Sequence, residues 1–341
     1  MKTRITMSDI ARVTGMHQST ISLALSSDSR LRPSTIARIK AAADSLGYTP
    51  DPMLVALSSY RRPFRPKVQQ SALAWLTNWS TREGWRCQPL FVQIFEAAQR
   101  RAAELGYSME NFWLNGQGLT PRRVSDILHA RGVHGLLLAP QPNDVHQLEM
   151  DWGRFSVVAV GPTLRQPEFH LVSNNQYRAV TQLCHQLSAR GYQRIGYSIP
   201  REFDDQINGQ WSAAFDHFQR DLPPARRTAR HEGIPTLENL SRWLHATRPD
   251  VVFSCHEQVA DLLRLAQAKG APPAEFALIG VAHRELGCAG MHEDANRVGI
   301  TAVDRLTAMI RLGEKGVPAA TCRTLIDATW VDAAAVEKST A

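Results

Sequence analysis

The N-terminal part of the sequence contains two short helical patterns joined by a single glycine, and this feature constrains the fold more than any other. Thr6-Met7-Ser8-Asp9 is typical of a helix start, because the Thr6 hydroxyl suits the N-cap and Asp9 the reciprocal position three residues on. Apolar residues follow at helical spacing as far as Thr14, and Gly15 suits the left-handed turn that ends a helix. The sequence therefore predicts a short helix followed by a tight turn.

A second and a third helix are expected after this turn. The second begins near His17 or Gln18; its inward residues are Ile21, Ala24 and Leu25, and its outward residues are Gln18, Ser19, Ser22 and Leu23. The third begins at Pro33, where a missing N–H costs no hydrogen bond, and ends at Gly47. Two helices joined by a tight turn form a helix-turn-helix, whose second helix can enter the major groove of DNA.

The excess positive charge of the chain lies in the same region. The 341 residues include 39 Lys and Arg against 32 Asp and Glu, a net charge of +7. Residues 1–67 hold eleven basic and four acidic side chains, so this segment alone carries +7 and the remainder holds 28 of each sign. A basic module on a neutral body is expected of a protein that docks on a polyanion, although a solvated basic face would give the same count.

From Ser71 onward, short apolar runs alternate with amphipathic helical patterns. Strands are expected at residues 72–76, 108–114, 135–139, 157–160, 194–198, 251–255 and 277–281. Such alternation is typical of βαβ units with parallel strands. The segment is too long for one such sheet, and similar helix-to-strand joints, Ala130-Arg-Gly-Val and Ala189-Arg-Gly-Tyr, occur in both halves. The sequence therefore predicts two α/β lobes with a cleft between them.

Two runs near the N-terminus, ITMSDIARVTGMHQSTISLALSS and LRPSTIARIKAAADSLGYTPDP, carry a specific pattern over about 55 residues. The spacing of Asp9-Ile10-Ala11, Gly15, Thr20-Ile21-Ser22 and Leu46-Gly47-Tyr48-x-Pro50 resembles the DNA-binding domain of the LacI/GalR family of bacterial transcription regulators. An unrelated helical hairpin is the alternative. The resemblance implies a regulator that binds double-stranded operator DNA as a homodimer and responds to a small-molecule effector.

The resemblance also implies which residues touch DNA. They are Thr6, His17, Gln18, Ser19, Thr20, Ser22, Leu23, Ser26 and Leu57. Gln18 and Ser19 are the candidates for base edges, whereas Thr6, Ser22 and Ser26 suit phosphate contacts. The chain departs from the family at His17, where Ser is usual, and at Leu23, where a guanine-reading Arg is common. A leucine cannot donate to guanine, so Leu23 is expected to contact a thymine methyl.

Leu57 belongs to a hinge helix that the family's pattern places after the Tyr48-x-Pro50 element. In the family this helix folds on operator DNA and inserts a leucine into the minor groove, which bends the duplex. The alternative is that Leu57 only packs within a linker helix. These considerations predict a helix-turn-helix domain at residues 1–50 and a hinge with a basic, proline-broken linker at residues 51–70.

For residues 71–341 the resemblance implies a two-lobed, periplasmic-binding-protein-like (type I) domain for effector binding and dimerisation. By analogy, the chain crosses between the lobes near Ser173, Met291 and Pro318. The expected first lobe spans about 71–172 and 291–318, and the second about 173–290 and 319–335. The fold class is thus an all-α DNA-binding domain followed by a two-lobed α/β domain.

Candidate effector contacts lie after strands, because open α/β sheets bind ligands at the carboxyl ends of their strands. They are Asn78, Trp79, Phe91, Asn174, Trp211 and Glu257. Asn174 stands where the family commonly has Asp, and Trp211 where it commonly has Arg, so the usual sugar-binding charges are missing. The aromatic residues of the first lobe could stack on a sugar or another flat face, with packing in the core as the alternative for each tryptophan.

Other classes of function are disfavoured. The sequence has no G-x-S-x-G elbow, P-loop, H-E-x-x-H or complete G-x-G-x-x-G, and the neighbours Cys255 and His256 would point to opposite faces of a strand. The five cysteines are scattered without a CxxC pair, and neither an export signal nor an apolar run of membrane-spanning length occurs.

The prediction is a cytoplasmic transcription regulator, a repressor of the LacI type, with no enzymatic activity, cofactor, metal or membrane contact. The alternative is a small-molecule-binding protein of the transport type without catalytic activity, which would need a signal peptide in place of the basic N-terminal domain.

Overall fold

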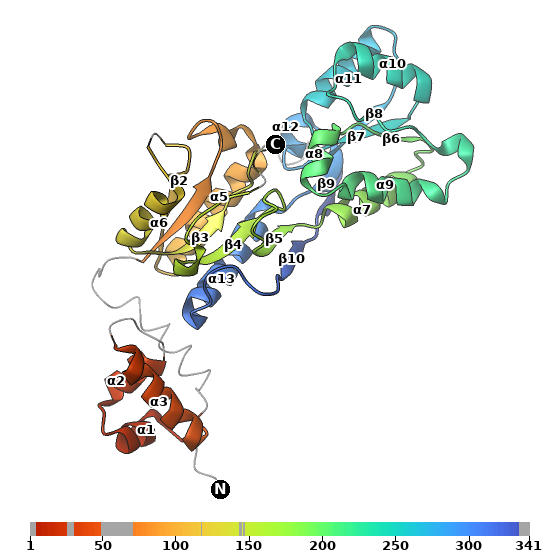
Figure 1. The fold of residues 1–341 in the computed structure, drawn as a ribbon. Coiled ribbons are helices and arrows are strands. Elements are labelled where there is room, and N and C mark those ends of the chain that lie inside the picture. Colours follow the sequence, from red (N-terminus) through yellow and green to blue (C-terminus); the bar gives the residue numbers. More distant parts are fainter. Residues whose placement is uncertain are drawn as a thin grey trace, which may run out of the picture.

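The computed structural model describes residues 5–25, 31–48, 71–116, 118–142, 145 and 147–333. Two predicted DNA contacts, Ser26 and Leu57, lie outside these residues. The described chain forms a three-helix domain and two α/β lobes, each lobe built around its own sheet (Figure 1). None of its helices is long and apolar enough to cross a membrane.

The N-terminal domain consists of α1 (Met7–Thr14), α2 (Gln18–Leu25) and α3 (Pro33–Leu46). Gly15, with φ 66°, ends α1 and permits the tight turn into α2. The small core joins all three helices through the buried side chains Ile10, Ile21, Ala24, Ile39 and Ala43. The predicted helix-turn-helix with a third helix is confirmed.

The first lobe contains a six-stranded sheet in the order β10-β5-β4-β3-β1-β2, in which all paired strands are parallel. Its strands are β1 (Ala72–Thr77), β2 (Ser108–Trp113), β3 (Val133–Leu138), β4 (Ser156–Val160), β5 (His170–Asn174) and β10 (Arg323–Ile326). The helices α5 (Pro89–Glu104) and α13 (Ala295–Leu312) pack on one face. The helices α6 (Pro121–Ala130) and η3 (Trp152–Arg154) pack on the other, and η2 (Gly84–Cys87) precedes α5.

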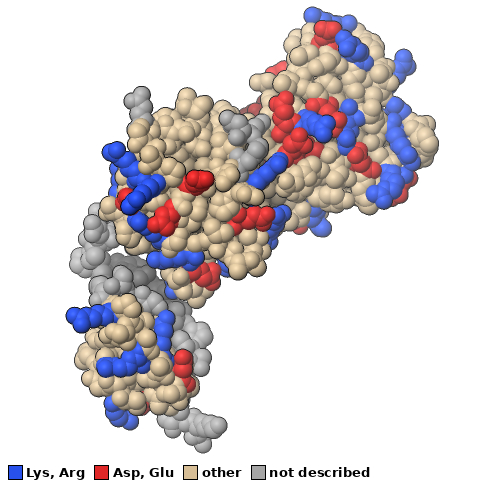
Figure 2. All heavy atoms as spheres, viewed as in Figure 1, with Lys and Arg blue, Asp and Glu red and all other residues tan. Residues whose placement is uncertain are grey.

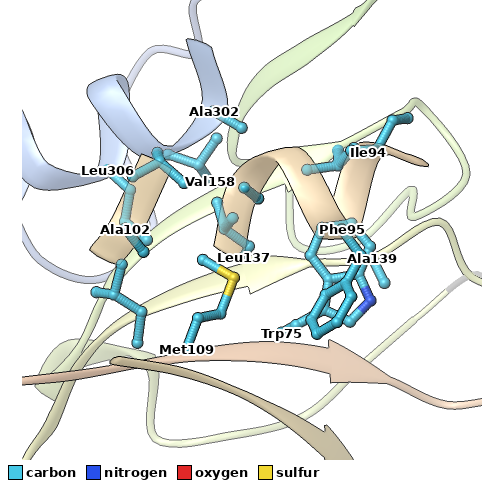
Figure 3. Close-up of a cluster of buried hydrophobic side chains, with 14 of the residues drawn as sticks. Trp75, Ile94, Phe95, Ala102, Met109, Leu137, Ala139, Val158, Ala302 and Leu306 are labelled. Atoms are coloured by element: carbon cyan, nitrogen blue, oxygen red, sulfur yellow. The ribbon is translucent and has the colours of Figure 1, made fainter. Parts of the chain in front are cut away.

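The core under α5 and α13 shows why these segments fold together. Alternate strand residues such as Trp75, Leu137 and Val158 point toward the two helices, and Phe95 and Leu306 meet them from the helix side (Figure 3). Because successive strand side chains point to opposite faces, the intervening residues form the second core under α6. A sheet buried on both faces accounts for the continuous apolar runs in the sequence.

The second lobe contains a five-stranded sheet in the order β11-β9-β8-β7-β6. Its strands are β6 (Ile195–Tyr197), β7 (Val251–Ser254), β8 (Glu275–Gly280), β9 (Ala289–His292) and β11 (Thr329–Val331). The helices α7 (Gln176–Ala189) and α9 (Gln210–Arg220) pack on one face, and α10 (Leu237–Thr247) and α11 (Gln258–Ala268) on the other. The short helices α8 (Arg201–Gln206), η4 (Pro224–Arg226) and α12 (His283–Leu286) lie in the connections. Among the described strands of this sheet, β11 alone runs antiparallel to its neighbour.

The chain passes between the two sheets three times: between β5 and α7, between β9 and α13, and between β10 and β11. The first two crossings lie within a few residues of Ser173 and Met291. The third prediction, at Pro318, is wrong, because β10 (Arg323–Ile326) still pairs with β5 in the first lobe. The assignment of residues 319–335 to the second lobe therefore holds only from β11 onward.

Polar side chains join the crossing segments to the elements that follow them. Asn175 accepts a hydrogen bond from the Arg178 N–H at the start of α7, and its Nδ2 donates to Asp327 Oδ1 at 2.9 Å. Asp294 accepts from the Arg297 N–H at 2.8 Å and so caps α13. Two crossings are thus linked directly through Asn175 and Asp327, which places the connections beside each other.

The visible face of the lobes carries Lys and Arg interspersed with Asp and Glu (Figure 2). Many charged side chains of the two lobes are paired; Arg101 and Asp304, for example, join α5 to α13 at 2.7 Å. This mixing agrees with the balanced charge count of the body.

Candidate DNA interface and interlobe pocket

The start of α2 is capped by a histidine. The backbone N–H of Ser19 donates to His17 Nδ1 at 3.3 Å, and the Ser19 hydroxyl lies 2.8 Å from the same nitrogen. A ring nitrogen that accepts here takes the place of the side-chain oxygen found at most N-caps. His17 therefore fixes the first turn of the helix that is expected to enter the major groove.

The predicted DNA contacts on α2 divide by exposure. Gln18, Ser19 and Ser22 are exposed, and Thr20 and Leu23 are half-buried. Ile21, which faces inward, is fully buried and locks α2 onto the other two helices. The outer face of α2 therefore presents short polar side chains with one leucine beside them, and it offers no basic side chain for reading guanine.

The start of α1 is organised by Thr6 and Asp9. Asp9 Oδ2 accepts hydrogen bonds from the Thr6 backbone N–H at 2.9 Å and from the Thr6 hydroxyl at 2.7 Å. These hydrogen bonds lower the pKa of Asp9, because they favour its ionised form. A carboxylate in the first turn also suits the positive end of the α1 dipole.

A pocket of about 460 Å³ lies between the two lobes. Trp79 and Phe91 line it from the first lobe, and Trp211 and Glu257 from the second. Asn174, at the end of β5, lines it at the first crossing between the lobes. Of the six candidates for effector contact, the structure thus brings five together.

The sixth candidate, Asn78, is not among the residues that line the pocket. Its carbonyl instead accepts a hydrogen bond from Asn115 Nδ2 at 3.0 Å. Asn78 therefore contributes to the loop beside the pocket rather than to its wall.

The tryptophans of the first lobe have different roles. Trp75 and Trp85 are fully buried in the core, as the packing alternative predicted. Trp79 is half-buried at the pocket wall, where its Nε1 donates to the Pro140 carbonyl at 3.0 Å. Its ring meets Phe91 edge-on with centroids 6.5 Å apart, so the two rings hold each other in place.

A hydrogen-bonded chain of three side chains forms part of the second-lobe wall. Trp211 Nε1 donates to Gln176 Oε1 at 2.7 Å, and Gln176 Nε2 donates to Glu293 Oε1 at 2.8 Å. Glu293 is only 4% exposed, and burial raises its pKa, while hydrogen bonds from Gln176 and Asn174 oppose that rise. The chain places a buried carboxyl group directly at the pocket.

Sequence reasoning missed Gln176 and Glu293. Glu293 follows β9, a strand that the sequence pattern did not reveal, so the rule that ligands bind after strands was never applied to it. Gln176 lies two residues after Asn174, where a search limited to the strand end stops.

Asn174 has an acceptor without a partner. The residue is 6% exposed, and its Oδ1 makes no hydrogen bond with any described part of the chain. A buried acceptor of this kind costs free energy unless a ligand or water donates to it. Asn174 Oδ1 is therefore an acceptor in the pocket wall that a hydrogen-bond donor of a ligand or water would satisfy.

One cluster resembles a catalytic triad without being placed to act as one. His231 Nδ1 lies 3.1 Å from Ser198 Oγ, and His231 Nε2 lies 3.2 Å from Asn239 Oδ1. Ser198 is fully buried and is not among the residues that line the interlobe pocket. Burial also lowers the pKa of His231. This cluster joins β6 to the segment before α10 and is structural.

Within the described residues, no group of three or more His, Cys, Asp or Glu side chains is arranged to hold a metal ion.

Comparison with known proteins shows similarity to bacterial transcription regulators. Residues 6–51 match the family described as bacterial regulatory proteins, lacI family. The HTH-type transcriptional regulator PtxS of Pseudomonas plecoglossicida is 26% identical over 263 residues, which cover 75% of this chain and 72% of PtxS.

Solved structures support the fold over nearly the whole chain. The lac repressor dimer bound to operator and the anti-inducer ONPF has a TM-score of 0.52 at 17% identity and covers 97% of this chain and 98% of its own. The complex of the transcriptional regulator CelR with cellobiose has a TM-score of 0.53 at 16% identity, with coverage of 96% and 98%. A LacI-family regulator from Rhizobium etli has a TM-score of 0.58 at 14% identity, with coverage of 77% and 98%.

Proposed function

We propose that this chain is a repressor of the LacI type that binds a pseudo-palindromic operator as a homodimer and responds to a small molecule in the interlobe pocket; the match of residues 6–51 to the lacI family and the similarity to PtxS support this proposal. The observation that carries the proposal is the presence, in one chain, of a basic helix-turn-helix domain and a two-lobed domain with a pocket of about 460 Å³. A two-fold axis would pair two copies of α2 on the two halves of such an operator.

The position of the pocket between the two lobes allows ligand binding to affect DNA binding. Since both lobes contribute to its wall, a ligand that contacts both changes the free energy of lobe closure. Closure would move the first lobes of a dimer relative to each other, and with them the hinge segments that contain Leu57. Ligand binding would thereby be coupled to the formation of the hinge helices on DNA.

The proposed activity is binding and regulation, with no catalytic step. It is supported by the burial of the Ser198 hydroxyl away from the pocket and by relatives that are transcription regulators. A regulator of this kind acts on the bacterial chromosome, so we propose the cytoplasm as its location.

Genome-wide footprinting followed by a gel-shift assay on the recovered sites tests the proposal. Full-length protein should bind a pseudo-palindromic site, and removal of residues 1–67 should abolish binding while leaving a soluble, folded dimer. Operator affinity that survives this deletion would overturn the proposal. A deletion variant that sediments as a monomer would overturn the assignment of dimerisation to the two lobes.

A further inference from the structure

We propose that the effector is a hydroxylated or amine-bearing ring compound without a negative charge, and that its phosphorylated or carboxylated counterparts are rejected. This inference rests on the proposed function and names the chemical class of its effector. It is carried by the charges, the unpartnered acceptor and the aromatic walls of the interlobe pocket.

No lysine or arginine is among the described residues that line the pocket. The lining residues include two acidic ones, Glu257 and Glu293. His256 also lines the pocket, but burial lowers its pKa and disfavours its charged form. Phosphate and carboxylate ligands are usually held by Arg or Lys, which compensate the hydration that the anion loses on binding. An anion in this pocket would lose its water and meet carboxyl groups instead.

Helix N-termini are the other usual anion sites, and those of α5, α7, α9 and α11 border the pocket. At α7 and α9, backbone N–H groups of the first turn already donate to the side chains of Asn175 and Asp204. At α11, the acidic residue Glu257 occupies the N-cap position, and the N–H groups of Val259 and Ala260 donate to the carbonyls of His256 and Glu257. At α5, Pro89 has no N–H, and the N–H groups of Phe91 and Val92 both donate to the Gln88 carbonyl. At each of these helix starts, backbone donors of the first turn are already engaged, which leaves fewer of them for an anion.

The acceptors of the pocket call for a ligand that donates hydrogen bonds. Asn174 Oδ1 is buried without a partner and lies in the pocket wall, and the Glu257 carboxylate provides a second acceptor at the opposite lobe. A hydroxyl or amino group satisfies such acceptors, whereas a phosphate or carboxylate at neutral pH adds further acceptors to them. Binding a donor would remove the free-energy cost of the unpaired Asn174 oxygen.

Aromatic side chains on both lobes point to a ring. Trp79 and Phe91 line the pocket from the first lobe, and Phe203 and Trp211 from the second. Aromatic faces pack well on the flat C–H face of a saturated ring, and they also attract an ammonium group. The volume of about 460 Å³ lies within the range of small-molecule sites.

The test is competitive equilibrium dialysis of the full-length protein against an equimolar mixture, read by mass spectrometry. The mixture contains matched sets: glucose, glucosamine, glucuronate and glucose 6-phosphate, and the corresponding forms of galactose, mannose and xylose that exist. A retained neutral or amino compound, with each anionic counterpart bound at least about tenfold more weakly, supports the inference. Retention of an acid or phosphate in preference to its neutral counterpart overturns it, as does retention of no compound. Comparison of the neutral sugars with the amino sugars shows whether the pocket prefers a hydroxyl or an amino group as the hydrogen-bond donor.

Charge variants test the cause of the selectivity. Glu257→Arg should raise the affinity for the anionic forms relative to the neutral ones by at least about tenfold. Glu238→Gln, at an exposed position on α10 paired with Arg242, is the matched control and should leave the ranking unchanged. Equal rankings in wild type and Glu257→Arg would contradict the role of pocket charge.

Asn174→Ala provides a second measurement and should weaken the retained ligand at least about fivefold. A folded Asn174→Ala protein with unchanged affinity would contradict the role of its oxygen. Operator binding in a gel shift separates this inference from the proposed function. If the protein does not bind operator DNA but ranks the ligands as expected, only the proposed function is refuted. If it binds operator DNA normally but prefers the anionic ligands, only the inference about the effector is refuted.

Discussion

His17 Nδ1 accepts the backbone N–H of Ser19 at 3.3 Å, so an imidazole caps the helix that is expected to read DNA. His17 is also exposed beside the outer face of α2, so contacts made by its ring can affect how well the first turn of α2 is ordered.

His17→Ala should therefore loosen the first turn of α2. Loss of an N-cap costs about 1 kcal/mol, which corresponds to an approximately fivefold faster exchange of the amides in that turn. Hydrogen–deuterium exchange of the full-length protein measures this effect. His17→Asn keeps a cap acceptor and should preserve slow exchange; equal rates in the two variants would rule out the capping role.

Leu23 should read a thymine methyl. If it does, replacing the contacted thymine by uracil should lower operator affinity, because an apolar contact in the major groove is lost. Titrations with matched thymine and uracil operators give the difference, and the Leu23→Ala protein should be insensitive to the exchange. If the wild-type protein binds the thymine and uracil operators with equal affinity, Leu23 does not contact the thymine methyl.

Trp211→Phe should destabilise the second lobe by about 1–3 kcal/mol, because it leaves the buried Gln176 oxygen without its donor. Urea unfolding followed by fluorescence or circular dichroism measures the loss. In a Gln176→Leu background the same substitution should cost less, since the acceptor is already absent. Additive losses would show that the hydrogen bond contributes nothing.

Glu293→Gln should change how stability depends on pH. Burial raises the pKa of Glu293 in the folded state above its ordinary value, so the folded protein binds this proton more tightly than the unfolded chain. The resulting stability is present below the ordinary pKa and is lost as pH rises through the folded pKa. The Tm of Glu293→Gln relative to wild type should therefore increase as pH rises from the ordinary pKa of a glutamate through the raised pKa of the folded state. A Tm difference that does not vary with pH would contradict this assignment.

Gly299→Ala should disrupt the contact between α13 and α5. A Cβ at this position would lie 2.4 Å from the Ile94 carbonyl oxygen, which is backbone and cannot swing away. The forced separation should cost about 1–3 kcal/mol or more in thermal or urea unfolding. Gly233→Ala is the control, because its nearest neighbour would be 3.8 Å away. Equal stability of the two variants would show that the helices can separate without cost.

The parts of the fold that follow a strong local pattern were predictable. The helix-turn-helix was readable because caps, apolar spacing and Gly15 agree with one another. Strands β1, β3 and β4 were readable because both of their faces are buried, which leaves nearly uninterrupted apolar runs. Strand β5 is also buried but was missed, because its run His170–Asn174 contains polar side chains.

The missed strands have specific physical causes. Strand β9 contains only Ala289–His292, and Gly290 interrupts its pattern. That glycine is required because a Cβ there would lie 2.0 Å from the Leu278 carbonyl oxygen of β8. Gly290 interrupts the apolar pattern of the sequence because the backbones of β9 and β8 approach closely at this position. Since β9 was not predicted, Glu293 was not recognised as a residue that follows a strand. In β10, the largely exposed run Arg323–Ile326 lacks the burial that marks the central strands.

The third crossing carries a consequence for synthesis of the protein. Strand β10 completes the edge of the first sheet, and β11 that of the second, although both strands come from the last part of the described chain. Neither lobe can therefore finish folding while the ribosome is still translating the segment before Arg323. The α1–α3 domain has its own core and can fold early, so a nascent chain would carry a finished DNA-binding domain before its lobes are complete. A premature stop before β10 would leave that domain without a complete lobe to control it.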